Sequence, residues 1–265
     1  MADATSAADA PPTAPRQSPQ RYDRIVVVGG GCYGGYYLRQ LGRAQRAGAI
    51  EWAELLVVDR DAACAVAHLS PDARPPRMRL AVAPWDDFFA TYLTDAAGAP
   101  AAGRDAIVPS PLMPHLMADW LVARARERWP DRSIRVERLD GSLPVPWQRS
   151  GDDGTHYVSF AEWICPINCI EPARCPHTRG PRTWSLPVAI RSHAAQARAA
   201  GDRADLPLLF HCTHRTFGVG MIDVGDVLAA DAAIAAAGSS GESSFLIGTV
   251  SHCHGALRRV TVGAA

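Results

Sequence analysis

The chain has 265 residues, of which 48% are hydrophobic and 20% are charged, and these values are typical of a globular protein with a substantial core. Its 27 basic and 27 acidic residues give a formal net charge of zero, which argues against the clustered basic surface that nucleic-acid binding requires. No apolar run approaches the roughly 18 residues that a membrane-spanning helix needs. We therefore expect a soluble protein that binds neither nucleic acid nor a membrane.

All 27 basic residues are arginine, and the chain contains no lysine. A chain without lysine cannot form a Schiff base through a side chain, and it cannot supply the lysine of a Walker A loop. Pyridoxal-phosphate catalysis and P-loop nucleotide hydrolysis are therefore excluded. The Tyr-x-x-x-Lys pair of short-chain dehydrogenases is excluded for the same reason.

Residues 1–22 are rich in Ala, Pro, Ser and Thr, and they lack the apolar segment of a signal peptide. We expect them to form a disordered tail on a cytoplasmic protein. In a reducing compartment, clustered cysteines indicate metal or redox chemistry rather than structural disulfides.

The chain after this tail alternates strand-like and helix-like segments. Strands are expected at 24–28, 54–59, 106–108, 133–139, 156–163, 206–212 and 245–250, and helices at 36–47, 85–96, 114–128, 187–199 and 224–237. This alternation predicts an α/β fold with a doubly wound, mainly parallel, Rossmann-like sheet and a cysteine-rich loop or small lobe inserted in it. We expect residues 23–145 to form a dinucleotide-binding half and residues 146–265 a Cys/His-rich half that completes the sheet.

A glycine-rich turn follows the first predicted strand. Gly29, Gly31 and Gly34 fit the pattern G-x-G-x-x-G, which permits a tight turn, close approach of a pyrophosphate, and close helix–strand packing. The turn opens a helix whose free N–H groups would face the phosphates. The next predicted strand ends in Asp59, and this context supports a dinucleotide site.

The segment resembles the NAD-binding domains of the TrkA-N and related Rossmann families. The matching residues are Val26-Val27-Val28-Gly29-Gly30-Gly31 with Gly34, and Val57-Val58-Asp59-Arg60-Asp61. The resemblance covers about a quarter of the chain and implies a binding unit rather than a reaction. It implies that Asp59 binds the adenosine ribose, which favours NAD, whereas Arg60 leaves NADP open and FAD is a further alternative.

Three cysteines lie within eleven residues of a proline-stiffened loop. Cys165, Cys169 and Cys175 have the spacing C-x3-C-x5-C, which matches neither a zinc ribbon nor a ferredoxin run. We expect them to bind zinc or an iron–sulfur cluster, with independent thiols or a redox disulfide as the alternative. His177 is the nearest further ligand in the sequence, and Cys212 or Cys253 could complete a four-cysteine site.

Two predicted strands end in similar tails, His211-Cys212-Thr213-His214 and His252-Cys253-His254. If the strands are parallel neighbours, both tails lie at the carboxyl edge of the sheet, where α/β proteins bind ligands. We therefore predict His214 and His254 as metal ligands or proton donors. His115, after the predicted strand 106–108, is a third candidate for contact with nicotinamide or substrate. Arg179, Arg182 and Trp184 could recognise an anion, or they could brace the loop through Glu171.

These patterns predict a dinucleotide-binding oxidoreductase with a Cys/His metal or iron–sulfur centre that acts on a small molecule or a redox partner protein. Nicotinamide transfers two electrons at once, whereas an iron–sulfur cluster transfers one. Either the metal is then structural or a Lewis acid, or the Rossmann unit holds FAD. The alternative is a non-enzymatic sensor of NAD(H), redox state or metal.

Overall fold

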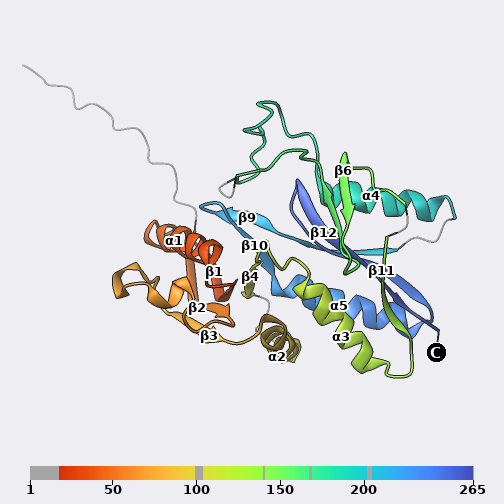
Figure 1. The fold of residues 1–265 in the computed structure, drawn as a ribbon, viewed down its shortest axis with the longest axis horizontal. Coiled ribbons are helices and arrows are strands. Elements are labelled where there is room, and N and C mark those ends of the chain that lie inside the picture. Colours follow the sequence, from red (N-terminus) through yellow and green to blue (C-terminus); the bar gives the residue numbers. More distant parts are fainter. Residues whose placement is uncertain (1–17, 99–103, 140, 167–168, 202–204, 265) are drawn as a thin grey trace, which may run out of the picture.

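The computed structural model describes residues 18–98, 104–139, 141–166, 169–201 and 205–264. This part of the chain contains five α-helices and twelve strands, so the predicted α/β class is confirmed. The strands form two mixed sheets rather than one mainly parallel sheet (Figure 1). No helix in the described residues is both long and apolar enough to cross a lipid bilayer.

The first sheet has the strand order β3-β2-β1-β4-β10-β9. Its strands are β1 (Gln20–Val28), β2 (Ile50–Asp59), β3 (Met78–Val82), β4 (Ala106–Val108), β9 (Thr213–Thr216) and β10 (Val219–Asp223). The first four are parallel to one another, whereas β10 is antiparallel to β4 and β9 is antiparallel to β10. Helix α1 (Cys32–Arg46) connects β1 to β2, and α2 (Trp85–Ala97) connects β3 to β4.

The second sheet has the order β6-β7-β12-β11-β8, and β5 pairs with β12 beside β7. Its strands are β5 (Ile134–Glu137), β6 (Trp147–Ser150), β7 (His156–Ser159), β8 (Leu206–His211), β11 (Ser243–Val250) and β12 (His254–Val262). Strand β8 is parallel to β11, and the other pairs are antiparallel. The remaining helices are α3 (Leu116–Arg128), α4 (Leu186–Ala199) and α5 (Val224–Ser239).

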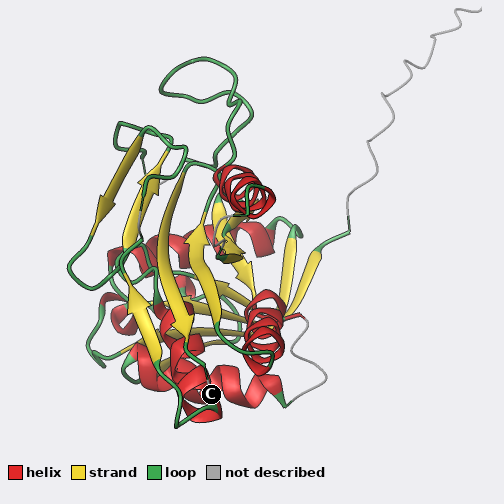
Figure 2. Ribbon diagram, turned by 90° about the vertical axis from the view of Figure 1, so that its right-hand side faces the viewer, coloured by secondary structure: helices red, strands yellow, loops and turns green. Residues whose placement is uncertain are grey.

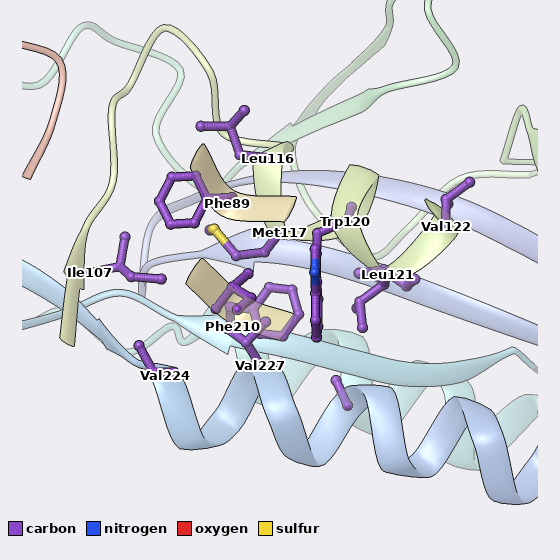
Figure 3. Close-up of a cluster of buried hydrophobic side chains, with 14 of the residues drawn as sticks. Phe89, Ile107, Leu116, Met117, Trp120, Leu121, Val122, Phe210, Val224 and Val227 are labelled. Carbon is purple, nitrogen blue, oxygen red and sulfur yellow. The ribbon is translucent and has the colours of Figure 1, made fainter. Parts of the chain in front are cut away.

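The largest core cluster joins the two sheets. Helices α2, α3 and α5 pack on one another and supply most of its side chains, including Phe89 of α2 and Trp120 of α3. Phe210 of β8 is 1% exposed and packs in the same cluster (Figure 3). A second cluster lies between α1 and the first sheet, and a third lies between α4 and the second sheet. Helices therefore cover both faces of each sheet.

Several boundaries differ from the sequence prediction. Strand β1 begins at Gln20, so residues 20–22 belong to the sheet and not to the expected tail, whose residues 1–17 lie outside the described residues. The strands β3, β6, β9, β10 and β12 were not predicted. Between β7 and α4 the cysteine-containing segment forms a long irregular connection that projects beyond the strands (Figure 2).

Candidate functional site

Two glycines of the predicted turn are required by the packing of the chain itself. Gly29 has a φ of +91°, a conformation that residues with a side chain rarely adopt. A Cβ atom on Gly34 would lie 1.9 Å from the carbonyl oxygen of Gly29, so only glycine lets α1 pack this closely on the turn. The first and third glycines therefore have the structural roles that the G-x-G-x-x-G pattern predicts.

The middle glycine, Gly31, has no such role within the protein. Its φ is −81°, and no described atom lies within 4 Å of the position that a Cβ would occupy. Gly31 precedes the first turn of α1, which has neither a side-chain cap nor an acidic residue in the described structure. The space in front of Gly31 is thus open, and it lies at the N-terminus of α1, where the first backbone N–H groups of a helix have no partner within the helix.

Asp59 lies at the carboxyl end of β2, beside this turn. Its carboxylate accepts hydrogen bonds from the backbone N–H groups of Gly30 (2.6 Å) and Asp61 (2.9 Å). Each carboxylate oxygen retains a further lone pair, so the group can still accept a hydroxyl hydrogen bond. Cys64 packs against the turn at Gly30. A Cβ atom at Gly30 would lie only 2.4 Å from Cys64 Sγ, so a larger residue there would collide with this thiol.

A cavity of about 720 Å³ lies at the carboxyl ends of β4, β8 and β11. Pro109 and Ser110, which follow β4, form one wall, and the pairing of Val27 with Val108 places this wall next to the glycine turn. Tyr37 of α1 also lines the cavity. The glycines themselves do not, so the cavity adjoins the turn rather than containing it.

Strands β8 and β11 are parallel neighbours, which is the condition for their tails to lie at one edge, and His211 lies opposite Val250. The backbone N–H of Cys212 donates to the carbonyl of Val250 at 2.8 Å, so the two Cys/His tails lie side by side. Five of the predicted site residues line the cavity: Cys165, Cys169, Cys212, His214 and His254. Glu171, which the sequence suggested only as a brace for the arginines, lines it as well.

Glu171 anchors the cysteine loop to the turn between β11 and β12. Its buried carboxylate accepts hydrogen bonds from Ser251 Oγ (2.6 Å), from the N–H of His252 (2.9 Å) and from the N–H of Cys253 (3.1 Å). Burial opposes ionisation, but these hydrogen bonds outweigh it and hold the pKa of Glu171 below its usual value. Arg182 instead donates to the carbonyls of Pro172 and Trp184 within the loop.

The three predicted histidines occupy different environments. His254 Nδ1 lies 2.9 Å from Ser159 Oγ, and His214 Nδ1 lies 4.0 Å from the Glu171 carboxylate. Burial lowers the pKa of both histidines below the usual value, so both are neutral at pH 7. His115 occupies the N-cap position of α3, with Nε2 3.7 Å from the Asp119 carboxylate, and it is not among the described residues that line the cavity.

The cysteines differ in ionisation. Burial raises the pKa of Cys212 and of Cys253 to about 12, so both are protonated thiols at pH 7. Trp184 Nε1 donates to Cys253 Sγ at 3.2 Å. Burial and the neighbouring Cys169 also raise the pKa of Cys165. Only Cys175 shows the opposite shift, because hydrogen bonds from Thr178 to its sulfur lower its pKa.

The predicted metal ligands are not assembled into one group. Cys165, Cys169 and Cys212 line the cavity, whereas Cys175 and Cys253 do not. Within the described residues, no three His, Cys, Asp or Glu side chains are grouped so that they could hold a metal ion. The described side chains thus supply no ready-made set of ligands, and the metal or iron–sulfur centre stays a prediction.

Sequence reasoning missed two serines that organise the site. Ser159 ends β7 and lies opposite His254 on β12, and Ser251 bonds both Glu171 and the backbone of His254. Serine is common in loops and at strand ends, so neither position has a signal that would distinguish it in the sequence.

The chain was compared with known proteins. No curated protein and no solved structure matches it. The family model AF_1314_C, described as the C-terminal domain of an uncharacterized protein, matches residues 117–263, which are more than half of the chain. This match covers the second sheet, the β9–β10 hairpin and most of the cavity wall, and the chain therefore belongs to the AF_1314_C family.

Proposed function

We propose that the chain binds a nicotinamide dinucleotide at the glycine turn and acts as an oxidoreductase on a small molecule in the adjoining cavity. The observation that carries this proposal is Gly31, a glycine that the packing of the chain does not require, at the open N-terminus of α1. Close approach of a pyrophosphate is the physical reason for a glycine at this place.

The surrounding fold supports the same proposal. The four parallel strands in the order β3-β2-β1-β4 match the first half of a dinucleotide-binding sheet. Asp59 stands where a carboxylate would accept the ribose hydroxyls, which favours NAD over NADP because a carboxylate repels a 2′-phosphate. NADP and FAD are the alternatives that a binding experiment separates.

The residues of the chain would then have separate roles in binding and in proton transfer. A bound nicotinamide supplies the site that takes up or releases a hydride. The N–H groups of α1 and Asp59 would hold the dinucleotide, and Ser110, which lines the cavity after β4, lies between the turn and the cavity that its reactive end would enter. The neutral histidines His214 and His254 line the cavity and can exchange a proton with a substrate.

Gly31→Val tests the binding site without disturbing the fold. A valine fits the open space at Gly31, so we expect a folded protein whose dinucleotide affinity is at least about 30-fold lower, or ~2 kcal/mol. The matched control is Gly225→Val, because Gly225 in α5 also has no described atom near its Cβ position and lies away from the turn. Isothermal titration with NAD, NADP and FAD measures the affinities, and circular dichroism checks the fold.

Two results would overturn the proposal: wild-type protein that binds none of the three dinucleotides, or equal affinity in both variants and the wild type. Turnover of NADH with an added acceptor then separates the enzyme from the alternative, an NAD(H)-linked sensor. Tight binding without turnover in any acceptor screen would favour the sensor.

A further inference from the structure

The charges around the cavity restrict the molecule that it can take. Among the described lining residues the only charged side chains are Glu162 and Glu171, and none is an arginine. Since the chain has no lysine and burial keeps His214 and His254 neutral, no described side chain of this wall carries a positive charge that could pair with a carboxylate or a phosphate. The lining also includes Trp147, Tyr157 and Trp163, whose rings favour a molecule with an apolar body.

The hydrogen bonds of Ser159 determine which nitrogen of His254 carries the proton. Ser159 Oγ lies 2.7 Å from the carbonyl oxygen of Ala161, to which it donates its single hydrogen. The N–H of Ala161 donates back to Oγ at 2.9 Å, and one lone pair of Oγ remains. His254 Nδ1, at 2.9 Å, must therefore be the donor to that lone pair.

This arrangement leaves Nε2 of the neutral His254 ring with a lone pair. His254 lines the cavity, and no hydrogen bond to its Nε2 occurs among the described residues. Ser159 is 5% exposed and lies directly opposite His254 in the β7–β12 pairing, so its orientation is held by the sheet. The ring is thus oriented as a hydrogen-bond acceptor for a hydroxyl group in the cavity.

We infer that the cavity takes an uncharged molecule with an apolar body and an alcohol or carbonyl group, and that His254 Nε2 exchanges the proton of that group. This inference rests on the proposed function for its reaction. A nicotinamide bound at the turn would take up the hydride that leaves the carbinol carbon, and His254 Nε2 would take the O–H proton as the C–O bond becomes C=O. In reduction the same proton returns from His254. Ser159 is a positioning residue that acts through His254.

The tautomer is measured directly by nitrogen NMR of the imidazole rings in the full chain without any dinucleotide, with His254→Gln used to assign the signal. We expect the proton on Nδ1 in the wild type. Ser159→Ala removes the acceptor, so the proton should move to Nε2 in a large share of molecules, and Ser159→Thr, which keeps the hydroxyl, should restore the wild-type signal. A wild-type ring with its proton on Nε2, or a tautomer unchanged in Ser159→Ala, would overturn the role of Ser159.

The substrate class is tested with three probes of nearly equal size: benzyl alcohol, benzoate and benzylammonium. Shifts of the indole N–H signals of Trp147 and Trp163 report binding in the same samples. We expect benzyl alcohol to bind at least tenfold more tightly than benzoate. The affinity for benzyl alcohol should fall in His254→Gln. Tighter binding of benzoate or of benzylammonium would contradict an uncharged substrate.

No dinucleotide is present in either experiment, so their outcome is independent of the Gly31→Val titration. If no dinucleotide binds but the tautomer and the order of probe affinities are as expected, the proposed oxidoreductase is refuted and the inferred specificity of the cavity stands. The opposite pattern would leave the oxidoreductase intact and refute this inference.

Discussion

Replacing Glu171 by glutamine should release the cysteine loop from the β11–β12 turn. The carboxylate of Glu171 is buried, and three donors converge on it from Ser251, His252 and Cys253. Glutamine has nearly the same shape but turns an NH₂ group toward donors that need an acceptor. The substitution therefore removes the charge and leaves at least one backbone N–H without its partner.

The magnitude follows from these contacts. A hydrogen bond to a charged group contributes about 1.5–3 kcal/mol, and an unsatisfied buried donor costs about 1–3 kcal/mol. Ser251 Oγ also lies 3.2 Å from the N–H of Cys253 and can serve that donor in part, so the losses do not simply add. We expect Glu171→Gln to lower the free energy of unfolding by about 3 kcal/mol.

The dependence on pH has a definite sign. The folded protein lowers the pKa of Glu171 below its ordinary value of 4.5, so the ionised group stabilises the fold. This contribution is fully present above pH 4.5 and is lost as the pH falls through the lower pKa of the folded state. The stability difference between wild type and Glu171→Gln should therefore be constant near neutrality and shrink below pH 4.5.

Urea unfolding followed by circular dichroism and tryptophan fluorescence measures the difference at each pH. Glu162→Gln is the matched control, because Glu162 is an exposed carboxylate nearby in the same segment. It should change the free energy of unfolding by less than about 0.5 kcal/mol. A Glu171→Gln variant as stable as this control, or a difference that grows in acid, would refute the reasoning.

Three further predictions concern the turn, the core and the thiols. Gly34→Ala should cost about 3 kcal/mol or more in urea unfolding, because its Cβ would overlap the carbonyl of Gly29, and a stability equal to that of Gly31→Ala would contradict this packing. Phe210→Ala should lower the free energy of unfolding by about 3–5 kcal/mol, since Phe210 is fully buried in the cluster that joins the sheets, and a loss below about 1 kcal/mol would contradict its place there. The metal centre predicted from the sequence is tested by metal analysis of anaerobically purified protein. Stoichiometric iron or zinc that is lost in Cys165→Ser, Cys169→Ser and Cys175→Ser but kept in Cys64→Ser would establish the centre. A wild-type protein without metal would show that the thiols are independent.

The parts of the fold that could be predicted are those with a strong local pattern. The apolar runs at 24–28 and 54–59 form β1 and β2, because a strand buried on both faces leaves an uninterrupted hydrophobic sequence. Helix α1 starts earlier than predicted, at Cys32. Gly34 and Gly35 are poor helix formers, but the contact of Gly34 with Gly29 overrides that propensity.

The parts that could not be predicted depend on distant partners. Strand β3 lies in a Pro/Arg-rich segment and becomes a strand by pairing with β2. Strand β12 forms a hairpin with β11, but its other side pairs with the distant strands β5 and β7. In the site, the similar tails after β8 and β11 lie together because these strands are parallel neighbours, a pairing that the sequence analysis could state only as a condition. The roles of Glu171 and Ser159 depend on contacts across 80 and 95 residues, which no local pattern encodes.

The β9–β10 hairpin has a consequence for how the chain can be divided. By sequence it lies within residues 117–263, the segment that the family model matches, but β10 pairs with β4 of the first sheet. A fragment cut before α3 would lose β4 and leave β10 as a bare edge, with Val219, Met221 and Ile222, all fully buried in the intact chain, exposed to solvent. Exposed apolar edge strands pair with other chains. The family segment, expressed alone, should therefore aggregate through this edge, and a soluble fragment would have to extend back through β4.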